Sequence, residues 1–295
     1  MKTIKLSEYC EALEISRQAH HKSNKTSLSH EKFEREVIEA VKEIRKTQPK
    51  VGAKKLKEHL DKDYCLFIGR DNFYKLLSKN RLLVLKKRYG MKTTDSRHYF
   101  EKYSNKIRKM VIDKPEQVFV SDITYIRVSA TFMYLFLVTD IFSKQIMGYC
   151  LGKTMHRENA LKALKEAMNK RTYSNSETIH HSDCGSQYCS SDYIELLKKN
   201  KFKVSMTEEN HCYENSIAER VNGILKAELG LDETMLSEKE AHTKVKNAIK
   251  IYNTKRLHLS CGMLTPEKAH KEGGPFKRMW SKRSYKKREI AKNAM

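Results

Sequence analysis

The sequence lacks long hydrophobic runs, and its start is not apolar. No stretch of about 18 apolar residues occurs in the 295-residue chain, and the first five residues, Met1 to Lys5, include two lysines. These absences argue against a membrane-spanning chain and against a signal peptide. We therefore expect a soluble, intracellular protein with no membrane partner.

The sequence also lacks a regular cysteine pattern. Its seven cysteines are scattered, and none forms a CxxC pair. Such a set predicts reduced or incidental thiols and not a disulfide framework. His180, His181, Cys184 and Cys189 are close in sequence, but their spacing fits no common zinc site. We do not expect zinc.

Positive charge is abundant and unevenly distributed. The net charge is +23, and residues 1–110 hold 28 Lys and Arg against 14 Asp and Glu. Residues 111–275 hold 23 against 21, and residues 276–295 hold 8 against 1. A nearly neutral middle between basic flanks predicts a folded core that is held on a polyanion by its ends.

Residues 1–84 predict a helical domain. Apolar side chains recur at helical spacing after Ser29, which we interpret as an N-cap, at Phe33, Val37, Ala40, Val41 and Ile44. Pro49 and Gly52 then interrupt the chain, and two shorter helices are expected at about 53–60 and 70–78. Three helices of this kind fit a DNA-binding helix-turn-helix domain, whose last helix reads the groove. A plain three-helix bundle is the alternative.

Two basic segments flank the central region. Residues 85–112, with Lys86, Lys87 and Arg88, predict a linker that lies along nucleic acid, although a solvated spacer would have the same composition. Residues 276–295 form a basic tail in which Trp280 and Tyr285 alternate with the charges. This tail is either a solubilising end or a nucleic-acid contact, and its aromatic residues favour the contact.

Residues 113–275 change to the pattern of an α/β domain. Strand patterns occupy about 117–128, 132–142, 145–152, 178–183 and 202–207, and helical patterns occupy about 157–170, 191–200, 215–229 and 237–253. Three strands followed by alternating helices and strands predict a mixed sheet flanked by helices. This is the order of a ribonuclease H-like catalytic core.

Three carboxylates occupy distinctive places in this region. Asp122 interrupts an otherwise apolar strand, Asp183 ends a strand, and Glu219 lies within a helix near its apolar side. Carboxylates of this kind suit Mg²⁺ or Mn²⁺, the ions of phosphoryl transfer. Asp140 also interrupts an apolar strand, and we interpret it as structural. Lys226 follows Glu219 by nearly two helical turns, so both should face the same way and Lys226 could hold a DNA phosphate.

These residues resemble a known family. Ser121–Ile126, His181–Tyr188, the stretch from Asn215 through Glu219 to Lys226, and the flanking motifs Thr93–His98, Tyr252–His258 and Thr265–Glu267 are similar to the insertion sequence three family of bacterial transposases. This family belongs to the DDE transposases, which are related to retroviral integrases. The resemblance covers roughly residues 5–275. Cys184 stands where the family often has Arg, and Glu214 where it often has Asp.

The resemblance implies a function and partners. Asp122, Asp183 and Glu219 would bind two Mg²⁺ ions, which Mn²⁺ can replace, and would cleave and then join DNA strands at the ends of a mobile element. Lys226 would contact the terminal base pairs, and Arg256, within the Tyr252–His258 motif, would also bind DNA. The expected partners are double-stranded element ends and target DNA, further copies of the chain, and the first-frame protein of the same element, in the bacterial cytoplasm at the nucleoid.

Two other functions fit the same residues. One is a ribonuclease H-like nuclease that cuts without joining, and the other is a transposon-derived DNA-binding regulator. The start of the chain shows no sustained heptads, so the sequence resembles a second reading frame product alone. The intact acidic triad favours the transposase.

Overall fold

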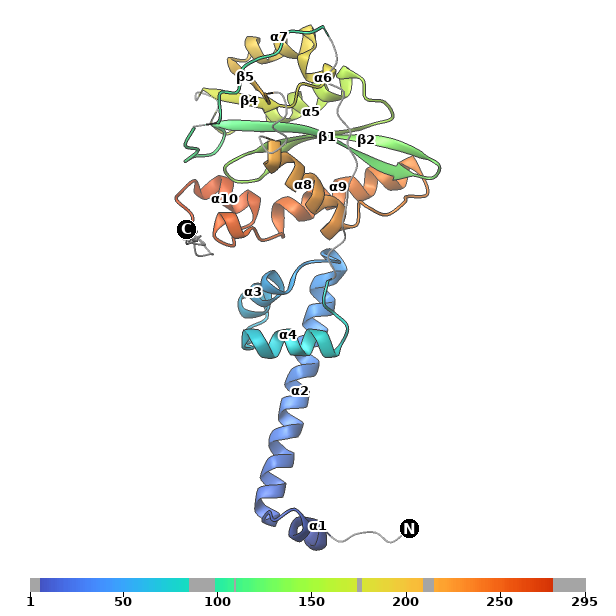
Figure 1. The fold of residues 1–295 in the computed structure, drawn as a ribbon, viewed down its shortest axis with the longest axis vertical. Helices are drawn as coiled ribbons and strands as arrows, with labels where there is room; N and C mark the ends of the chain where they lie inside the picture. Colours follow the sequence, from blue (N-terminus) through green and yellow to red (C-terminus); the bar gives the residue numbers. More distant parts are fainter. Residues whose placement is uncertain (1–5, 85–98, 109, 174–176, 209–214, 278–295) are drawn as a thin grey trace, which may run out of the picture. The chain divides into compact units, whose positions relative to one another are not determined.

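The computed structural model describes residues 6–84, 99–108, 110–173, 177–208 and 215–277. The chain divides into two compact units, Met1–Tyr89 and Gly90–Met295 (Figure 1). The division falls within the predicted linker, 85–112. Among the described residues, no helix is both long enough and apolar enough to cross a membrane.

The first unit is helical, as the sequence predicts. It contains α1 (Leu6–Ala12), α2 (Arg17–Thr47), α3 (Ala53–Asp63) and α4 (Arg70–Lys79). The second half of α2 packs with α3 and α4 around a core that includes Val37, Val41, Leu56, Leu60 and Phe73. The expected helices at 53–60 and 70–78 are therefore present as α3 and α4.

The predicted start of the long helix at Ser29 is wrong. Helix α2 begins thirteen residues earlier, after its N-cap Ser16, whose Oγ accepts a hydrogen bond of 3.0 Å from the backbone N–H of Ala19. The sequence conceals this start because residues 17–32 are largely polar and show no apolar stripe. Periodicity identified only the half of the helix that has a core to pack against.

The second unit is built on one five-stranded sheet. Its strands are β1 (Val118–Val128), β2 (Thr131–Asp140), β3 (Ile146–Gly152), β4 (Thr178–Ser182) and β5 (Phe202–Met206), in the order β3-β2-β1-β4-β5. Strands β1, β2 and β3 are antiparallel neighbours, whereas β4 runs parallel to β1 and β5 runs parallel to β4. A mixed sheet is what the order of elements along the chain predicts, and the predicted ribonuclease H-like fold class is confirmed.

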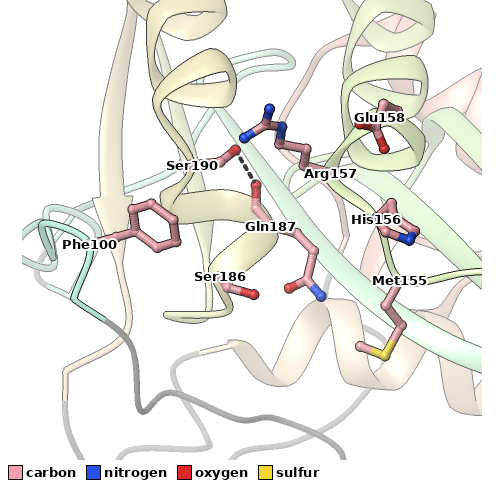
Figure 2. Close-up of a pocket in the computed structure, with 8 residues that line it drawn as sticks. All are labelled: Phe100, Met155, His156, Arg157, Glu158, Ser186, Gln187 and Ser190. Carbon is pink, nitrogen blue, oxygen red and sulfur yellow. Dashed lines mark hydrogen bonds between the residues drawn. The ribbon is translucent and has the colours of Figure 1, made fainter.

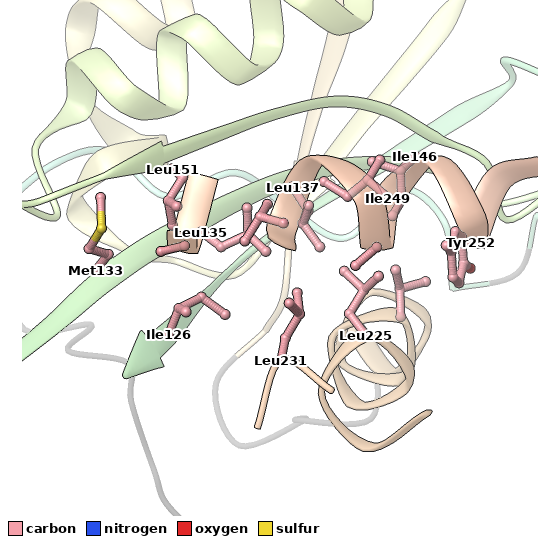
Figure 3. Packing of buried hydrophobic residues seen from close by; sticks show 14 of the residues in the cluster. Ile126, Met133, Leu135, Leu137, Ile146, Leu151, Leu225, Leu231, Ile249 and Tyr252 are labelled. Carbon is pink, nitrogen blue, oxygen red and sulfur yellow. The ribbon is translucent and has the colours of Figure 1, made fainter. Parts of the chain in front are cut away.

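Helices cover both faces of the sheet. One face packs against α5 (Arg157–Asn169), α6 (Ser186–Cys189) and α7 (Ser191–Lys199). The other packs against α8 (Ser216–Leu229) and α9 (Glu238–Thr254), where Ile126, Leu135 and Leu137 meet Leu225 and Ile249 (Figure 3). Side chains alternate between the faces of a strand, so Asp122, of the same parity as Ile126, lies on the face that α8 covers.

The second half of the predicted linker belongs to the folded unit. Tyr103 packs against the core on the α5 side, and Ile107 packs beside Val118 and Val120. The backbone N–H of Lys106 donates a hydrogen bond of 2.9 Å to Ser205 Oγ on β5. Residues 99–108 are therefore not a free linker, because their spaced apolar side chains have a core to join. Residues 85–98 lie outside the described part of the chain.

A buried ion cluster anchors helix α10 (Pro266–Glu272), whose N-cap is Thr265 and whose first residue is Pro266. His270 of this helix lies between two fully buried carboxylates, with Nε2 3.2 Å from Glu116 and Nδ1 3.5 Å from Asp140. Asp140 also accepts hydrogen bonds from the backbone N–H of Glu116 and from Ser143. This supports the interpretation of Asp140 as structural.

Candidate active site

Asp122 lies on the central strand and is partly buried beneath α8. Its Oδ1 accepts a hydrogen bond of 2.9 Å from the backbone N–H of Ile123, and its Oδ2 accepts one of 2.8 Å from Nδ2 of Asn222. Burial and the negative charge of Asp183 raise the pKa of Asp122 to about 7, and Glu219 adds to the rise, although the two hydrogen bonds oppose it. Two other carboxylates are therefore close enough to act on Asp122.

Asp183 follows the last residue of β4, directly beside β1. The two strands pair only through Val118–Val120 and Ile179–His181, so Asp122 and Asp183 both stand just beyond the point where pairing stops. Oδ1 of Asp183 accepts a hydrogen bond of 3.1 Å from the backbone N–H of Gly185. The expected position at the carboxyl end of a strand therefore sets Asp183 beside Asp122.

Helix α8 carries the other two expected side chains. Glu219 lies in its first turn and is exposed, while Ala218 and Val221 beside it are buried. Lys226 is partly buried, with Nζ 4.1 Å from the centre of the Tyr125 ring. Burial lowers the pKa of Lys226, and the charges of Asp122 and Asp232 oppose that shift. Lys226 thus lies within the electrostatic reach of Asp122.

Two asparagines of the α8 region hold β1, and sequence reasoning missed both. Nδ2 of Asn215 donates to the backbone oxygen of Ser121 at 3.1 Å, and Nδ2 of Asn222 donates to Asp122. Both side chains are buried, and no donor among the described residues reaches Oδ1 of either. The signal available in the sequence was spacing. Asn222 lies three residues after Glu219 and seven residues after Asn215, and this spacing places both asparagines on one side of α8.

A buried polar layer joins the two acid-bearing strands. Nε2 of His180 lies 2.7 Å from Ser121 Oγ and 2.9 Å from the Tyr193 hydroxyl. Burial, with a smaller effect of His181, lowers the pKa of His180 to about 3, so the ring is neutral. His180 therefore links β1, β4 and α7. Among the described residues, no three His, Cys, Asp or Glu side chains converge as a ready-made metal cluster.

The placement of Arg256 does not support its expected contact with DNA. Arg256 is 3% exposed, and its guanidinium donates two hydrogen bonds, of 2.8 and 2.9 Å, to the carboxylate of Glu228. This bidentate pair joins α8 to the end of α9 and gives Arg256 a structural role. Lys86, Lys87 and Arg88 lie outside the described residues.

An open hollow lies between the start of α5 and α6. It has a volume of about 360 Å³ (Figure 2). Its lining combines the apolar side chains of Phe100 and Met155 with the polar side chains of His156, Arg157 and Gln187. A polar, open surface of this kind suits an extended ligand better than an enclosed small molecule.

Comparison with known proteins places these features in a family. Residues 112–212 and 200–266 match two sequence profiles, each described as an integrase core domain. The chain is 30% identical over 264 residues to the 31 kDa protein of insertion element IS600 from Shigella sonnei, and the match spans 87% of this chain and 95% of that protein. The chain belongs to the IS3 family of DDE transposases.

Other transposases match a part of the chain. The transposase of insertion sequence IS629 from Shigella sonnei is 31% identical over 61% of this chain and 60% of its own length. Transposase InsF of IS3A from Escherichia coli K12 is 35% identical over 52% of this chain and 53% of its own length. The second unit holds the transposase core.

Solved integrase structures are more distant. The catalytic core domain of HTLV-2 integrase is 18% identical, with a TM-score of 0.43 over 53% of this chain and 97% of that domain. An intasome of simian T-cell lymphotropic virus reaches a TM-score of 0.46 at 16% identity, over 75% of this chain and 70% of that one.

Proposed function

We propose that this transposase cuts DNA at the ends of a mobile element and joins the freed 3′ ends to target DNA, with Asp122, Asp183 and Glu219 as its acidic triad. The observation that carries the proposal is that Asp183, at the end of β4, and Glu219, on α8, both lie near enough to Asp122 on β1 to raise the pKa of its carboxyl. Repulsion between like charges destabilises such a group of carboxylates, and a bound cation would remove that repulsion.

The donor chemistry of the site fits divalent metal ions. Carboxylate oxygens are the ligands that Mg²⁺ and Mn²⁺ prefer, and the triad would hold two such ions. Bound there, the metals would activate the attacking oxygen and stabilise the leaving oxygen of an in-line displacement. No sulfur or imidazole ligand is needed, and His180 is already held by Ser121 and Tyr193.

Side chains around the triad would orient the Asp122 carboxylate and neutralise a DNA phosphate. Asn222 holds the Asp122 carboxylate, and Asn215 holds the backbone of the residue before it. The cation of Lys226 would neutralise a phosphate of the strand that lies beside Asp122. Water would attack first and a DNA 3′-hydroxyl second, so no covalent protein–DNA bond is required.

The basic flanks would supply most of the affinity for DNA. The first unit, the segment with Lys86, Lys87 and Arg88, and the tail after Phe276 would bind phosphates of element ends and target. We further propose that several copies of the chain assemble on DNA at the bacterial nucleoid. The first-frame protein of the same element would be a partner, and the frameshifted fusion would be the form that transposes efficiently.

A strand-joining assay tests the proposal. Labelled element ends are incubated with a target plasmid in Mg²⁺ or Mn²⁺, using wild type and the variants Asp122→Asn, Asp183→Asn and Glu219→Gln. Loss of an outer partner of a metal ligand costs about 10- to 100-fold, so loss of a ligand should lower joining by at least about 100-fold. Glu195→Gln, an exposed acid on α7, is the matched control and should keep wild-type activity.

The outcomes separate the three functions. Cleavage without a joined product identifies the ribonuclease H-like nuclease. Specific DNA binding without cleavage or joining identifies the regulator. Full joining activity in Glu219→Gln would remove that residue from the triad.

A further inference from the structure

Two adjacent aromatic rings of the β1–β2 hairpin are flanked by two cations. The Lys226 ammonium lies 4.1 Å from the centre of the Tyr125 ring, and this ring meets Phe132 edge-on with 5.3 Å between centres. The Arg127 guanidinium lies 5.5 Å from the centre of the Phe132 ring. These four side chains are called the ring–cation array.

The hairpin register builds the array. Arg127 is directly opposite Phe132, and Tyr125 is two residues before Arg127, so all three share one face of the β1–β2 pair. Strand β4 leaves β1 after Val120, so β4 does not cover the β1 edge at Tyr125. Lys226 reaches the Tyr125 ring from α8.

The array is on the surface and not in the core. Phe132 is 40% exposed, Arg127 is exposed, and Tyr125 and Lys226 are partly exposed. Neither ring belongs to the buried hydrophobic clusters of the described residues. The backbone beneath is fixed, because the N–H of Met235 donates to the carbonyl oxygen of Arg127 at 3.0 Å. The rings are therefore held in place, with Lys226 over one face of Tyr125 and Arg127 over one face of Phe132, so a base would stack on the opposite face of each ring.

The array also leads away from the acidic triad. Tyr125 is three residues past Asp122 on β1, so the two side chains point to opposite faces of the strand, and Lys226, which is charge-coupled to Asp122, reaches the Tyr125 ring at the β1 edge. A strand whose phosphate lies at Asp122 and Lys226 would therefore have to turn around this edge to pass over Tyr125 and Phe132 to Arg127.

We infer that the ring–cation array binds an unpaired stretch of the DNA strand next to the scissile phosphate, with bases stacked on the rings and phosphates on the two cations. Rings interleaved with cations are the usual surface for single strands, because every base has a face that stacks. A closed duplex hides those faces. The inference rests on the proposed function, since it takes the triad to be the site of cutting.

A binding experiment without divalent metal tests the array independently of catalysis. Fluorescence anisotropy in EDTA compares a blunt duplex with the same duplex carrying an unpaired thymidine tail. Because bases of the tail can stack on the rings, wild type should bind the tailed duplex about tenfold more tightly than the blunt duplex.

Matched variants separate stacking from packing. Phe132→Leu and Tyr125→Leu keep apolar bulk but lose the ring, and each should remove most of the tail preference. Tyr125→Phe and Phe132→Tyr keep the ring and should retain it. Arg127→Gln should reduce the salt dependence of tail binding by about one phosphate contact. Lys203→Gln, an exposed cation on β5, should leave the tail preference unchanged.

Two results would overturn the inference: equal wild-type affinity for tailed and blunt DNA, or a tail preference that survives Tyr125→Leu combined with Phe132→Leu. Thermal melting checks that the variants are folded, and Arg127→Gln, which alters no core packing, gives an answer if a ring variant unfolds. Joining without tail preference would refute the array alone. Tail preference without joining would refute the proposed function alone.

Discussion

Asp122 is an unfavourable residue for the folded chain when no cation is present. Its pKa is raised to about 7 by burial and by Asp183, so above that pH the carboxylate is charged in an environment that disfavours the charge. The contribution of Asp122 to stability is therefore negative and grows as the pH rises from about 4 to about 7. Under the proposed function, Asp122 lowers the stability of the metal-free protein at the position where it would bind the metal.

We therefore expect Asp122→Asn to raise the melting temperature in EDTA at pH 8. The amide removes the buried charge and keeps the side-chain volume. Added Mg²⁺ should raise the melting temperature of wild type but not that of the variant. Thermal melting measures both effects, and Glu195→Gln serves as the control. A lower melting temperature for Asp122→Asn in EDTA would contradict this account.

Asn222 should matter more for activity than for stability. Asn222→Ala removes the hydrogen bond to Oδ2 of Asp122, and outer partners of metal ligands contribute about 10- to 100-fold to activity. We expect strand joining to fall by that factor, and the melting temperature to fall by only a few degrees, because one buried hydrogen bond to a carboxylate is lost. A variant that joins at the wild-type rate would show that α8 and β1 position Asp122 without the amide.

The sequence predicted residues whose chemistry conflicts with their surroundings and missed those whose chemistry is ordinary. Asp122 could be identified because a charge in an apolar strand needs a partner. Asn222 gave no such conflict, since an asparagine in a helix is unremarkable until its neighbour is known. Arg256 was misinterpreted because its partner, Glu228, lies 28 residues earlier and its burial is set by tertiary packing.

At the scale of elements, the close packing of β3 on α5 explains why position 148 is a glycine. A Cβ added at Gly148 would lie 2.1 Å from the backbone oxygen of Ala163 and 2.6 Å from the backbone nitrogen of Ala167. These atoms belong to helix α5 and cannot move without displacing it. The sheet and the helix therefore meet backbone to backbone at this point.

Gly148→Ala should destabilise the second unit by about 3 kcal/mol, at the upper end of the cost of overpacking. Gly223 offers the matched control, because it lies in α8 with nothing within 4 Å of an added Cβ. Gly223→Ala should stabilise by about 0.5–1 kcal/mol through helix propensity. Urea denaturation gives both values, and a neutral Gly148→Ala would mean that α5 can shift away from β3.

The ion cluster of His270, Glu116 and Asp140 should hold helix α10 less strongly at alkaline pH. Burial lowers the pKa of His270, but Asp140 and Glu116 outweigh it and raise the value to about 9, above its ordinary 6.5. Protonated His270 stabilises the folded chain. This contribution to the free energy of unfolding is complete below about pH 6.5 and is lost as the pH rises to about 9. The shift corresponds to about 3 kcal/mol.

We expect the free energy of unfolding to fall between about pH 6.5 and 9 in wild type, and to fall less in His270→Gln. Urea denaturation across this range measures the difference. His242→Gln, in helix α9 outside the cluster, is the control and should follow wild type. Parallel pH profiles for wild type and His270→Gln would show that His270 carries no charge in the folded chain.

Elements with a core on one side were predictable, and elements without one were not. The strands and helices of the second unit follow the patterns of their buried faces, within a few residues at each end. The first half of α2 has no apolar stripe, so its start at Ser16 left no periodic signal. Residues 99–108 read as polar linker because only a few of their side chains, such as Tyr103 and Ile107, reach the core.

At the scale of the whole molecule, the excess of positive charge lies in the two ends of the chain and not in residues 111–275. The tail 276–295 holds 8 basic residues against 1 acidic residue. Removing residues 278–295 should flatten the salt dependence of DNA binding, because fewer counterions are released. Affinity titrations at several salt concentrations measure the slope. An unchanged slope would identify the tail as a solubilising end.

The brief pairing of β1 and β4 has a consequence for the fate of the gene. The strands pair from Val118 to Val120, and both aspartates stand beyond this ladder. Asp122 pairs with Leu137 of β2 through its backbone, which a substitution of the side chain keeps, so we expect a copy that loses either carboxylate to fold and, under the proposed function, to occupy DNA ends. Decay of the element would thus turn the enzyme into a dominant inhibitor of its active relatives, and wild-type joining should fall as Asp183→Asn protein is mixed in.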